Sequence, residues 1–422
     1  MKQLVILGGG FAGLWAAMSA AAERVDANAD AGKIDITLIS KDAHLVIRPR
    51  LYEGAGEDKR IPLKPLLDKI GVRFIQATIE SIDPQHKQVF LSNHTSAQIS
   101  YDAVILATGS HLKKLNVTGV KQYGFSADTY EETERLDQQL TRIVAAQEEV
   151  AKTLVVIGAG FTGLEIATEL HSRLKKKSDK TCRIILVDKE EIAGAELGVN
   201  PKPYIDEALR LHNIELRLGI SVKELTGNSV TLTDGEVIAT QTVVFANGME
   251  ANKLTSSFGE PDAGAQGRLA VAQDLSIPGY DNAFGAGDVV WAYTEPLVPS
   301  DNSALSISSN KNLAYDADRP RTLFSCQHAI QLGRFAGYNA IKKLRGQPGK
   351  DYEQAFYATC LDLGDWGALF TTGWDRVADK TGVEGKEMKK MINTQWIYPP
   401  SPELLPEEIH AFVAFDEEES AA

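Results

Sequence analysis

A glycine-containing phrase occurs twice in this chain and constrains its fold more than any other feature. VILGGGFAGLWAA spans 5–17, and VVIGAGFTGLEIA spans 155–167. In each copy an apolar run meets three glycines spaced GxGxxG, and an Ala- and Leu-rich helical pattern follows. This is the strand–turn–helix pattern of a dinucleotide-binding βαβ unit. The duplication predicts two such units in one polypeptide, each binding one dinucleotide.

The glycines of each motif have different expected roles. The first permits the tight turn from strand to helix, the second lets the backbone approach a pyrophosphate, and the third lets helix and strand pack closely. The helix N-terminus then offers N–H groups and partial positive charge to the phosphates. The predicted contacts are Gly8, Gly10, Phe11, Ala12 and Gly13 in the first motif, and Gly158, Gly160 and Gly163 in the second.

The remaining pattern predicts an α/β fold class with two Rossmann-like domains. Expected strands lie at 3–8, 101–110, 153–158, 183–188 and 242–248, with IDITLIS ending at Ser40 as a further strand. Expected helices lie at 11–24, 161–176 and 325–345. Alternation of strands and helices indicates parallel sheets.

An acid at the end of the second strand of such a unit binds the ribose hydroxyls. In the second unit this is Asp188, which closes RIILVD. Its carboxylate repels a 2′-phosphate, so this site is expected to prefer NADH over NADPH. In the first unit the position is Ser40, followed by Lys41, and Asp42 is the nearest alternative acid. We expect Ser40 and Lys41 to contact the first dinucleotide.

Charge and cysteine content exclude several classes of function. The net charge of −13 is unlike that of a nucleic-acid-binding protein. Cys182, Cys326 and Cys360 form no close pair, so neither a disulfide framework nor a metal site is predicted. The chain starts directly in a strand, without a charged and apolar leader, and no run reaches the roughly 18 apolar residues of a membrane span. A cytoplasmic location is expected.

The order of four motifs resembles the flavoproteins with two dinucleotide-binding domains. These motifs are the first GxGxxG, ATG at 107–109, the second GxGxxG, and Gly287-Asp288. In those proteins the first motif binds FAD, the second binds NAD(P)H, and the GD aspartate contacts the ribityl chain. The resemblance implies that Thr108, Gly109 and Asp288 contact FAD.

Four segments are similar to the type II NADH:quinone oxidoreductases. They are HLVIRPRLYEGA at 44–55, TGLEIATEL at 162–170, VVFANGMEAN at 243–252 and CQHAIQLG at 326–333. The resemblance covers about residues 1–345 and implies hydride transfer from NADH to FAD, with two electrons passing on to a quinone. Through the segment 243–252 it also implies that Gly248 contacts a cofactor.

The resemblance implies a discontinuous FAD domain with the NADH domain inserted in it. The predicted parts are FAD domain 1–120, NADH domain 121–275, FAD domain 276–345 and a C-terminal subdomain 346–422. Three catalytic candidates follow. Glu165 is expected to face the flavin–nicotinamide stack, and Gln327 and Gln331, one helical turn apart, are expected beside the quinone pocket.

The C-terminal region departs from the family pattern. Residues 373–396 interleave apolar side chains with lysines and could lie on the inner face of the cell membrane as a peripheral contact. Their charges nearly cancel, and Gly382 and Gly385 are expected to interrupt a helix. Packing on the body of the protein or in a homodimer is therefore the favoured alternative. The polar stretch 292–321 is expected to be a long loop over the acceptor site, with disorder as the alternative.

Three other functions stay open from the sequence. A sulfide:quinone oxidoreductase shares this architecture but uses cysteines on both sides of the flavin, and only Cys326 and Cys360 are available near the end of the chain. A soluble NADH-dependent reductase of another small-molecule or protein acceptor would fit the weak membrane signal. A non-catalytic nucleotide sensor would fit the missing acid at Ser40.

Overall fold

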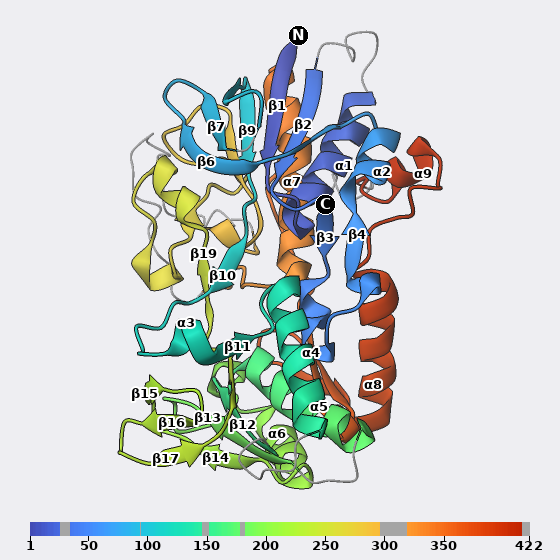
Figure 1. Cartoon of the computed structure of the whole chain (residues 1–422). Helices are drawn as coiled ribbons and strands as arrows, with labels where there is room; N and C mark the ends of the chain where they lie inside the picture. The colour runs from blue at the N-terminus through green and yellow to red at the C-terminus, as the bar shows by residue number, and fades with distance from the viewer. Residues whose placement is uncertain (26–33, 93, 146–151, 178–181, 296–318, 416–422) are drawn as a thin grey trace, which may run out of the picture.

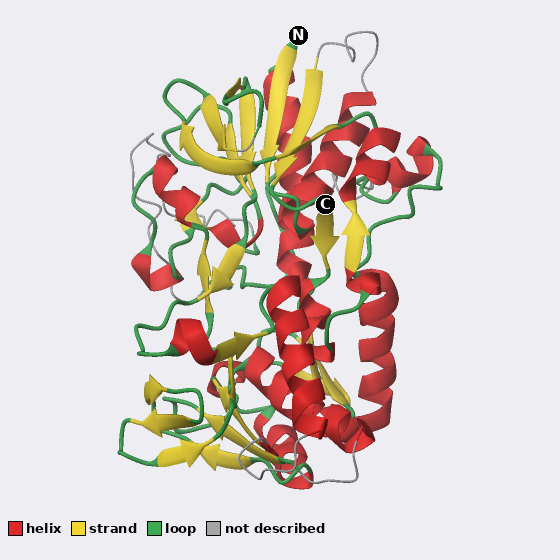
Figure 2. Ribbon diagram, viewed as in Figure 1, coloured by secondary structure: helices red, strands yellow, loops and turns green. Residues whose placement is uncertain are grey.

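The computed structural model describes residues 1–25, 34–92, 94–145, 152–177, 182–295 and 319–415. Two bodies lie at opposite ends of an elongated molecule (Figure 1). One is built around the strand that precedes the first glycine motif, and the other around the strand that precedes the second. Most of the long helices run down one side of the molecule (Figure 2).

Each body contains a five-stranded parallel sheet. Four neighbouring strands follow the same chain order in both sheets, whereas the strand at one edge comes last along the chain in the first sheet and first in the second. The first has the order β21-β9-β1-β2-β5, with β1 (Lys2–Leu7), β2 (Ile34–Ser40), β5 (Arg73–Gln76), β9 (Ala103–Leu106) and β21 (Ala283–Gly285). The second has the order β11-β18-β12-β13-β14, with β11 (Gly124–Ser126), β12 (Thr153–Ile157), β13 (Arg183–Val187), β14 (Glu215–Arg217) and β18 (Thr242–Phe245). The predicted fold class, with two Rossmann-like units, is confirmed.

Smaller sheets extend both bodies. Three-stranded antiparallel sheets are formed by β6 (Thr78–Asp83), β7 (Gln88–Ser92) and β8 (Gln98–Ser100) in the first body, and by β15 (Val222–Leu225), β16 (Ser229–Leu232) and β17 (Val237–Ala239) in the second. A third consists of β23 (Ala358–Asp362), β24 (Ala368–Thr372) and β25 (Val377–Lys380). Two further pairs are β3 (His44–Val46) with β4 (Arg60–Pro62), and β20 (Leu269–Ala270) with β22 (Val290–Trp291).

The chain passes between the two bodies through a pair of antiparallel strands. β10 (Ser110–Leu112) leaves the first body, and β19 (Met249–Ala251) returns to it. Ser110 lies opposite Ala251 in this pair, directly after the ATG segment at 107–109. The ends of both glycine-motif sheets are thereby joined by a short, paired connection.

The helices cover the sheets and connect their strands. The longer ones are α1 (Phe11–Val25), α4 (Tyr130–Ala145), α5 (Phe161–Lys177), α6 (Lys202–Leu211), α7 (Cys326–Arg345) and α8 (Gly382–Met391). Shorter ones are α2 (Leu63–Lys69), α3 (Val120–Tyr123) and α9 (Pro406–Ala411). The α7 N-terminus is capped by Ser325, whose Oγ accepts from the His328 N–H at 3.2 Å.

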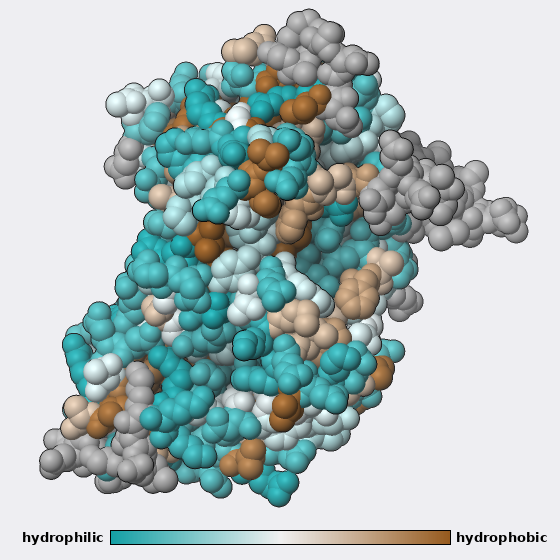
Figure 3. Space-filling view, turned by 90° about the vertical axis from the view of Figure 1, so that its right-hand side faces the viewer, coloured by the Kyte–Doolittle hydropathy of each residue, from teal (hydrophilic) through white to brown (hydrophobic). Residues whose placement is uncertain are grey.

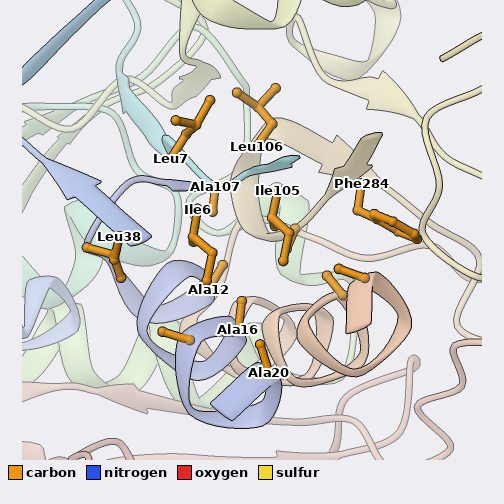
Figure 4. Packing of buried hydrophobic residues seen from close by; sticks show 14 of the residues in the cluster. Ile6, Leu7, Ala12, Ala16, Ala20, Leu38, Ile105, Leu106, Ala107 and Phe284 are labelled. Atoms are coloured by element: carbon orange, nitrogen blue, oxygen red, sulfur yellow. The ribbon is translucent and has the colours of Figure 1, made fainter. Parts of the chain in front are cut away.

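The core of the first body depends on close contact between α1 and α7. Ala12, Ala16 and Ala20 line the face of α1 that packs in this core (Figure 4). On α7, a Cβ placed on Gly333 would lie 2.2 Å from the Ala12 carbonyl oxygen, and one on Gly337 would lie 2.2 Å from that of Ala16. The two backbones therefore touch where glycine faces alanine, which fixes the N-terminus of α7 beside the first glycine motif.

Gly337→Ala is expected to lower the free energy of unfolding by about 1 kcal/mol. The added methyl would press on the Ala16 backbone, and overpacking of roughly 1–3 kcal/mol outweighs the ~1 kcal/mol that alanine gains over glycine in a helix. Urea unfolding measures this change. Lys343→Ala on the exposed side of the same helix is the control, and equal stability of the two variants would contradict the close-contact explanation.

The expectation that two glycines interrupt a helix within 373–396 is wrong. Gly382 begins α8, and Gly385 lies inside it. A Cβ placed on Gly385 would lie 2.0 Å from the Ala368 carbonyl oxygen, so this glycine lets α8 cross β24 closely. Most of the predicted long loop, 296–318, lies outside the described residues.

Candidate active site

The first glycine motif has the backbone geometry that its sequence predicts. Gly8 adopts φ +113°, and a Cβ on it would lie 2.2 Å from the Ala107 carbonyl oxygen. A Cβ on Gly13 would lie 1.8 Å from the Gly8 carbonyl oxygen, whereas one on Gly10 would meet no atom within 4 Å. The first and third glycines are thus required by the turn and by packing, and the second leaves its face open for a phosphate.

Several polar groups gather beside this open face. The Thr108 Oγ1 atom is buried and has no hydrogen-bond partner in the described part of the chain. Gly287 lies against Ala12, which brings Asp288 next to the first motif. The Ser110 hydroxyl donates to Asp288 Oδ2 at 2.6 Å, and burial raises the pKa of the Asp288 carboxyl. An unsatisfied hydroxyl and a buried carboxyl next to an open glycine fit a polar ligand such as FAD.

Ser40 stands at the position where a ribose-binding acid was expected in the first unit. Ser40 is buried, and its Oγ would lie 2.8 Å from a Cβ placed on Gly9, so the serine packs beneath the glycine loop. Lys41 is exposed. Asp42 Oδ1 accepts from the His44 N–H at 3.0 Å and lies 3.1 Å from His44 Nδ1, so it is engaged in its own turn. Ser40 and Lys41 stay predictions as FAD contacts.

The second motif repeats the geometry of the first with one difference. Gly158 adopts φ +106°, and a Cβ on Gly163 would lie 1.7 Å from the Gly158 carbonyl oxygen. Asp188 accepts a hydrogen bond from the Ala159 N–H, so the predicted ribose acid does lie at the glycine loop. The difference is at Gly160, whose face is covered by the carboxylate of Glu196.

The end of β18 also borders this second motif. Gly248 adopts φ +89° and has no atom within 4 Å of an added Cβ. Its neighbour Asn247 donates from Nδ2 to the Lys113 carbonyl oxygen at 2.8 Å, while its Oδ1 is buried without a partner in the described structure. An open glycine beside an unsatisfied amide oxygen fits the predicted NADH site.

Glu165 lies in a buried cluster of charged groups where three parts of the chain meet. Lys389 of α8 donates from Nζ to Glu165 Oε1 at 2.7 Å and to the Cys360 carbonyl oxygen at 2.8 Å. The Asp362 N–H donates to the same Glu165 oxygen at 3.1 Å. The side chains of Glu165 and Lys389 are only 6% and 8% exposed. The pair therefore joins the helix after the second glycine motif to the C-terminal subdomain.

The environment of Glu165 changes its acidity. Burial raises the pKa of its carboxyl from 4.5 to about 7, although Lys389 acts in the opposite direction. Tyr52, which packs in the same hydrophobic core as α5, borders the cluster and donates to Asp362 Oδ2 at 2.9 Å. Lys386 donates to Asp362 Oδ1 at 2.5 Å and is 42% exposed, so the cluster extends to the surface. Glu165 is thus a carboxyl able to take or give a proton near neutral pH.

The two predicted glutamines lie on α7 and are both half-buried. The Ala358 N–H points to Gln327 Oε1 at 3.5 Å, which ties the helix start to β23. They share a helix face as predicted, and their catalytic role stays a prediction.

Sequence reasoning missed a residue between them. His328 is fully buried, its Nδ1 lies 2.9 Å from Gln354 Oε1, and burial lowers its pKa to about 4. Its ring is nearly parallel to those of Tyr357 and Trp374. The sequence feature that could have pointed to His328 is its place in CQHAIQLG, between the two candidate glutamines.

Cys326 and Cys360 are poor nucleophiles in this fold. Neither forms a disulfide within the described residues, and burial raises the pKa of the Cys326 thiol to about 11 and that of the Cys360 thiol to about 12. A thiol with so high a pKa is protonated at neutral pH and attacks slowly. This chemistry does not favour exchange with sulfur substrates.

The comparisons decide the family. A model of the pyridine nucleotide-disulphide oxidoreductases matches residues 2–319. The chain belongs to this family. An NADH dehydrogenase-like protein of Mycobacterium tuberculosis is 37% identical to this oxidoreductase over 406 residues, covering 95% of each chain. A type II NADH:quinone oxidoreductase of Staphylococcus haemolyticus is 26% identical over 421 residues, covering 94% of this chain and 95% of its own.

Solved structures show the same fold. NDH2 of Plasmodium falciparum in complex with NADH aligns with a TM-score of 0.74 at 15% identity, over 98% of this oxidoreductase and 97% of that chain. A sulfide:quinone oxidoreductase of Aquifex aeolicus aligns with a TM-score of 0.69 at 21% identity, over 93% and 90%. Together with the family match, these findings confirm the resemblance stated from sequence, and FAD and NADH as the expected cofactors.

Gly10→Ala is expected to produce a folded protein without flavin. The added methyl meets no protein atom, so stability of the cofactor-free chain should change little, but it would occupy the face that the pyrophosphate approaches. The measurement is flavin absorbance per chain after purification and after incubation with FAD. Gly13→Ala is the contrasting variant, because its methyl would strike the Gly8 carbonyl and impair folding itself. Normal flavin content in Gly10→Ala would refute this assignment.

Proposed function

We propose that this oxidoreductase transfers hydride from NADH to FAD and passes two electrons to a quinone. Support comes from relatives named type II NADH:quinone oxidoreductase and demethylphylloquinone reductase, at 26% and 27% identity. The observation within this chain that carries the proposal is the buried pair Glu165–Lys389. It links α5, the helix after the second glycine motif, to α8 near the C-terminal end of the chain.

Quinone reduction needs protons as well as electrons. NADH and a quinone yield NAD⁺ and a hydroquinone, and one proton per turnover must come from solvent. Glu165, whose pKa is raised by burial to about 7, can exchange a proton near neutral pH. The hydrogen bond from exposed Lys386 to Asp362, which borders Glu165, offers a polar connection to the surface.

The remaining residues bind and orient the two cofactors. FAD, when bound, accepts hydride and delivers the electrons to the acceptor. Gly8, Gly10 and Gly13 would hold the pyrophosphate of FAD. Asp288 and Thr108 would contact other parts of the same cofactor. Gly158, Gly160, Gly163 and Asp188 would hold NADH, with Gly248 at the other edge. Gln327 and Gln331 would lie at the acceptor side, on the helix that packs against α1.

Contact with a membrane or a second subunit would fall on the C-terminal subdomain. Val383, Met391 and Trp396 are 75%, 39% and 54% exposed. On the face that carries α8, apolar residues form separate spots in a hydrophilic surface rather than one patch (Figure 3). Among the described helices, none has the length and apolar character to cross a bilayer. We place any peripheral contact with the inner face of the cell membrane on these three side chains.

Steady-state assays with different acceptors test the proposal. Purified protein loaded with FAD is given NADH and, separately, a short-chain quinone, oxygen or ferricyanide, with sulfide as an alternative donor to the quinone. The proposal expects the highest kcat/KM for NADH with the quinone and no quinone reduction by sulfide. The proposal would be refuted if the flavin-loaded protein failed to oxidise NADH with any quinone tested.

A further inference from the structure

The two glycine motifs differ at their second glycine, where a pyrophosphate approaches the backbone. A Cβ on Gly10 would meet nothing within 4 Å, whereas one on Gly160 would lie 2.5 Å from Glu196 Oε1, 3.0 Å from Cδ and 3.4 Å from Oε2. The whole carboxylate of Glu196 therefore stands over Gly160, in the space that the phosphates of NADH need. The first motif serves as an internal reference in which that space is open.

The helix that would bind the phosphates holds this carboxylate. The Phe161 N–H, at the start of α5, donates to Glu196 Oε1 at 2.8 Å. Unpaired N–H groups at the start of a helix bind anions, and a carboxylate and a phosphate use the same donors. Glu196 is thus an anion already bound at the predicted anion site, and it belongs to the protein itself.

The Glu196 side chain is exposed, so it can turn away from Gly160 into solvent. Glu196 is exposed to solvent and lies in a single-turn helix, Ala195–Leu197, between Gly194 at φ +73° and Gly198 at φ +83°. A cation is close: Arg376 Nη1 lies 3.4 Å from the main-chain oxygens of both Glu196 and Leu197. Arg376 therefore places a positive charge beside the main chain of the segment that carries Glu196.

We propose that Glu196 competes with NADH for the second glycine motif, so that the dinucleotide binds only when this carboxylate turns away. The inference rests on the proposed function in taking NADH as the ligand of this motif. Carboxylate and pyrophosphate carry the same sign of charge and share one set of donors, so they exclude each other. Glu196 therefore weakens binding of nucleotides that carry a diphosphate and leaves ligands without phosphate unaffected.

Kinetics of two variants test the competition. Glu196→Gln keeps an oxygen that can accept from Phe161 but removes the charge, and Glu196→Ala removes both. The KM for NADH is expected to fall about fivefold in the first, the effect of one unit charge at about 4 Å in water, and by at least as much in the second. The kcat/KM for reduced nicotinamide riboside, which lacks phosphate, is expected to stay unchanged. Glu191→Gln removes an equal charge from an exposed neighbour and is the control.

Binding of ADP-ribose separates this inference from the proposed function. ADP-ribose carries the diphosphate but no nicotinamide, so calorimetry reports the competition even if the protein oxidises no NADH. Tighter binding of ADP-ribose by both Glu196 variants, with the control unchanged, supports the competition whatever the acceptor assays give. Unchanged or weaker binding in the Glu196 variants, at thermal unfolding midpoints equal to that of the unmodified protein, overturns it.

Discussion

Replacing Lys389 by methionine is expected to lower the free energy of unfolding by about 3–5 kcal/mol at pH 8. Removing one partner of a buried ion pair leaves the other charge without compensation, and losses of this size follow. Lys389 is 8% exposed and donates to Glu165 and to the Cys360 carbonyl oxygen, so both acceptors lose their partner. Urea unfolding at fixed FAD concentration measures the effect.

The loss is expected to shrink as the pH falls. Burial raises the pKa of Glu165, and the positive charge of Lys389 lowers it. Removing Lys389 therefore raises the pKa of Glu165 beyond about 7. At pH 6 the carboxyl of the variant is then protonated, and the cost of an isolated buried charge is largely avoided. The variant is therefore expected to be closest to the unmodified protein in stability at low pH.

A second substitution provides the internal check. In the double variant Glu165→Gln with Lys389→Met both charges are absent, so most of the lost stability should return. Lys390→Met, at the exposed neighbouring position of α8, is the matched control and should change the free energy of unfolding by less than about 0.5 kcal/mol. A double variant as unstable as Lys389→Met alone would show that the pair is not the cause.

The parts of the site that local sequence determines were predictable. A glycine next to a strand end has its role set by the turn it makes, so the close approaches at Gly8, Gly13, Gly158 and Gly163 follow from the spacing alone. The parallel pairing of β1 with β2 and of β12 with β13 also follows, because each motif specifies its own βαβ unit.

The contacts between distant segments were not predictable in this way. Lys389 lies 224 positions from Glu165 and was grouped with lysines of a candidate membrane-facing segment, because composition does not tell a buried lysine from an exposed one. Glu196 sits in a segment without regular periodicity, and only the fold shows that its carboxylate reaches Phe161. Such pairings depend on how the subdomains pack, which no local pattern encodes.

The kcat of quinone reduction is expected to fall as the pH rises through about 7, and Glu165→Gln is expected to abolish this dependence. Burial raises the pKa of Glu165 to about 7, so the carboxyl is protonated below that pH and able to donate, and is ionised above it. Groups facing it from three elements are Lys389, Asp362 and Tyr52. General acid catalysis contributes typically 10²–10⁴-fold, so Glu165→Gln should lower kcat by about 10²-fold at pH 6.

Stability supplies a second readout of the same ionisation. The folded chain keeps the proton on Glu165 up to about pH 7, whereas the unfolded chain releases it near 4.5. The stabilising contribution of this group is therefore fully present below pH 4.5 and is lost as the pH rises to about 7. Glu191→Gln, which removes a carboxyl from an exposed position outside the cluster, is the control.

The half-reactions separate proton delivery from a general loss of structure. Reduction of the bound flavin by NADH without an acceptor takes no proton from the chain, so Glu165→Gln should carry it out at a rate near that of the unmodified protein. Reoxidation of the flavin by the quinone consumes a proton, so the whole loss of rate in Glu165→Gln should appear in this half-reaction. If both half-reactions slow equally, Glu165 acts by holding α5 against the C-terminal subdomain, and its role is structural. A defect confined to reoxidation, together with the loss of the pH dependence near 7, requires a proton that passes through this carboxyl.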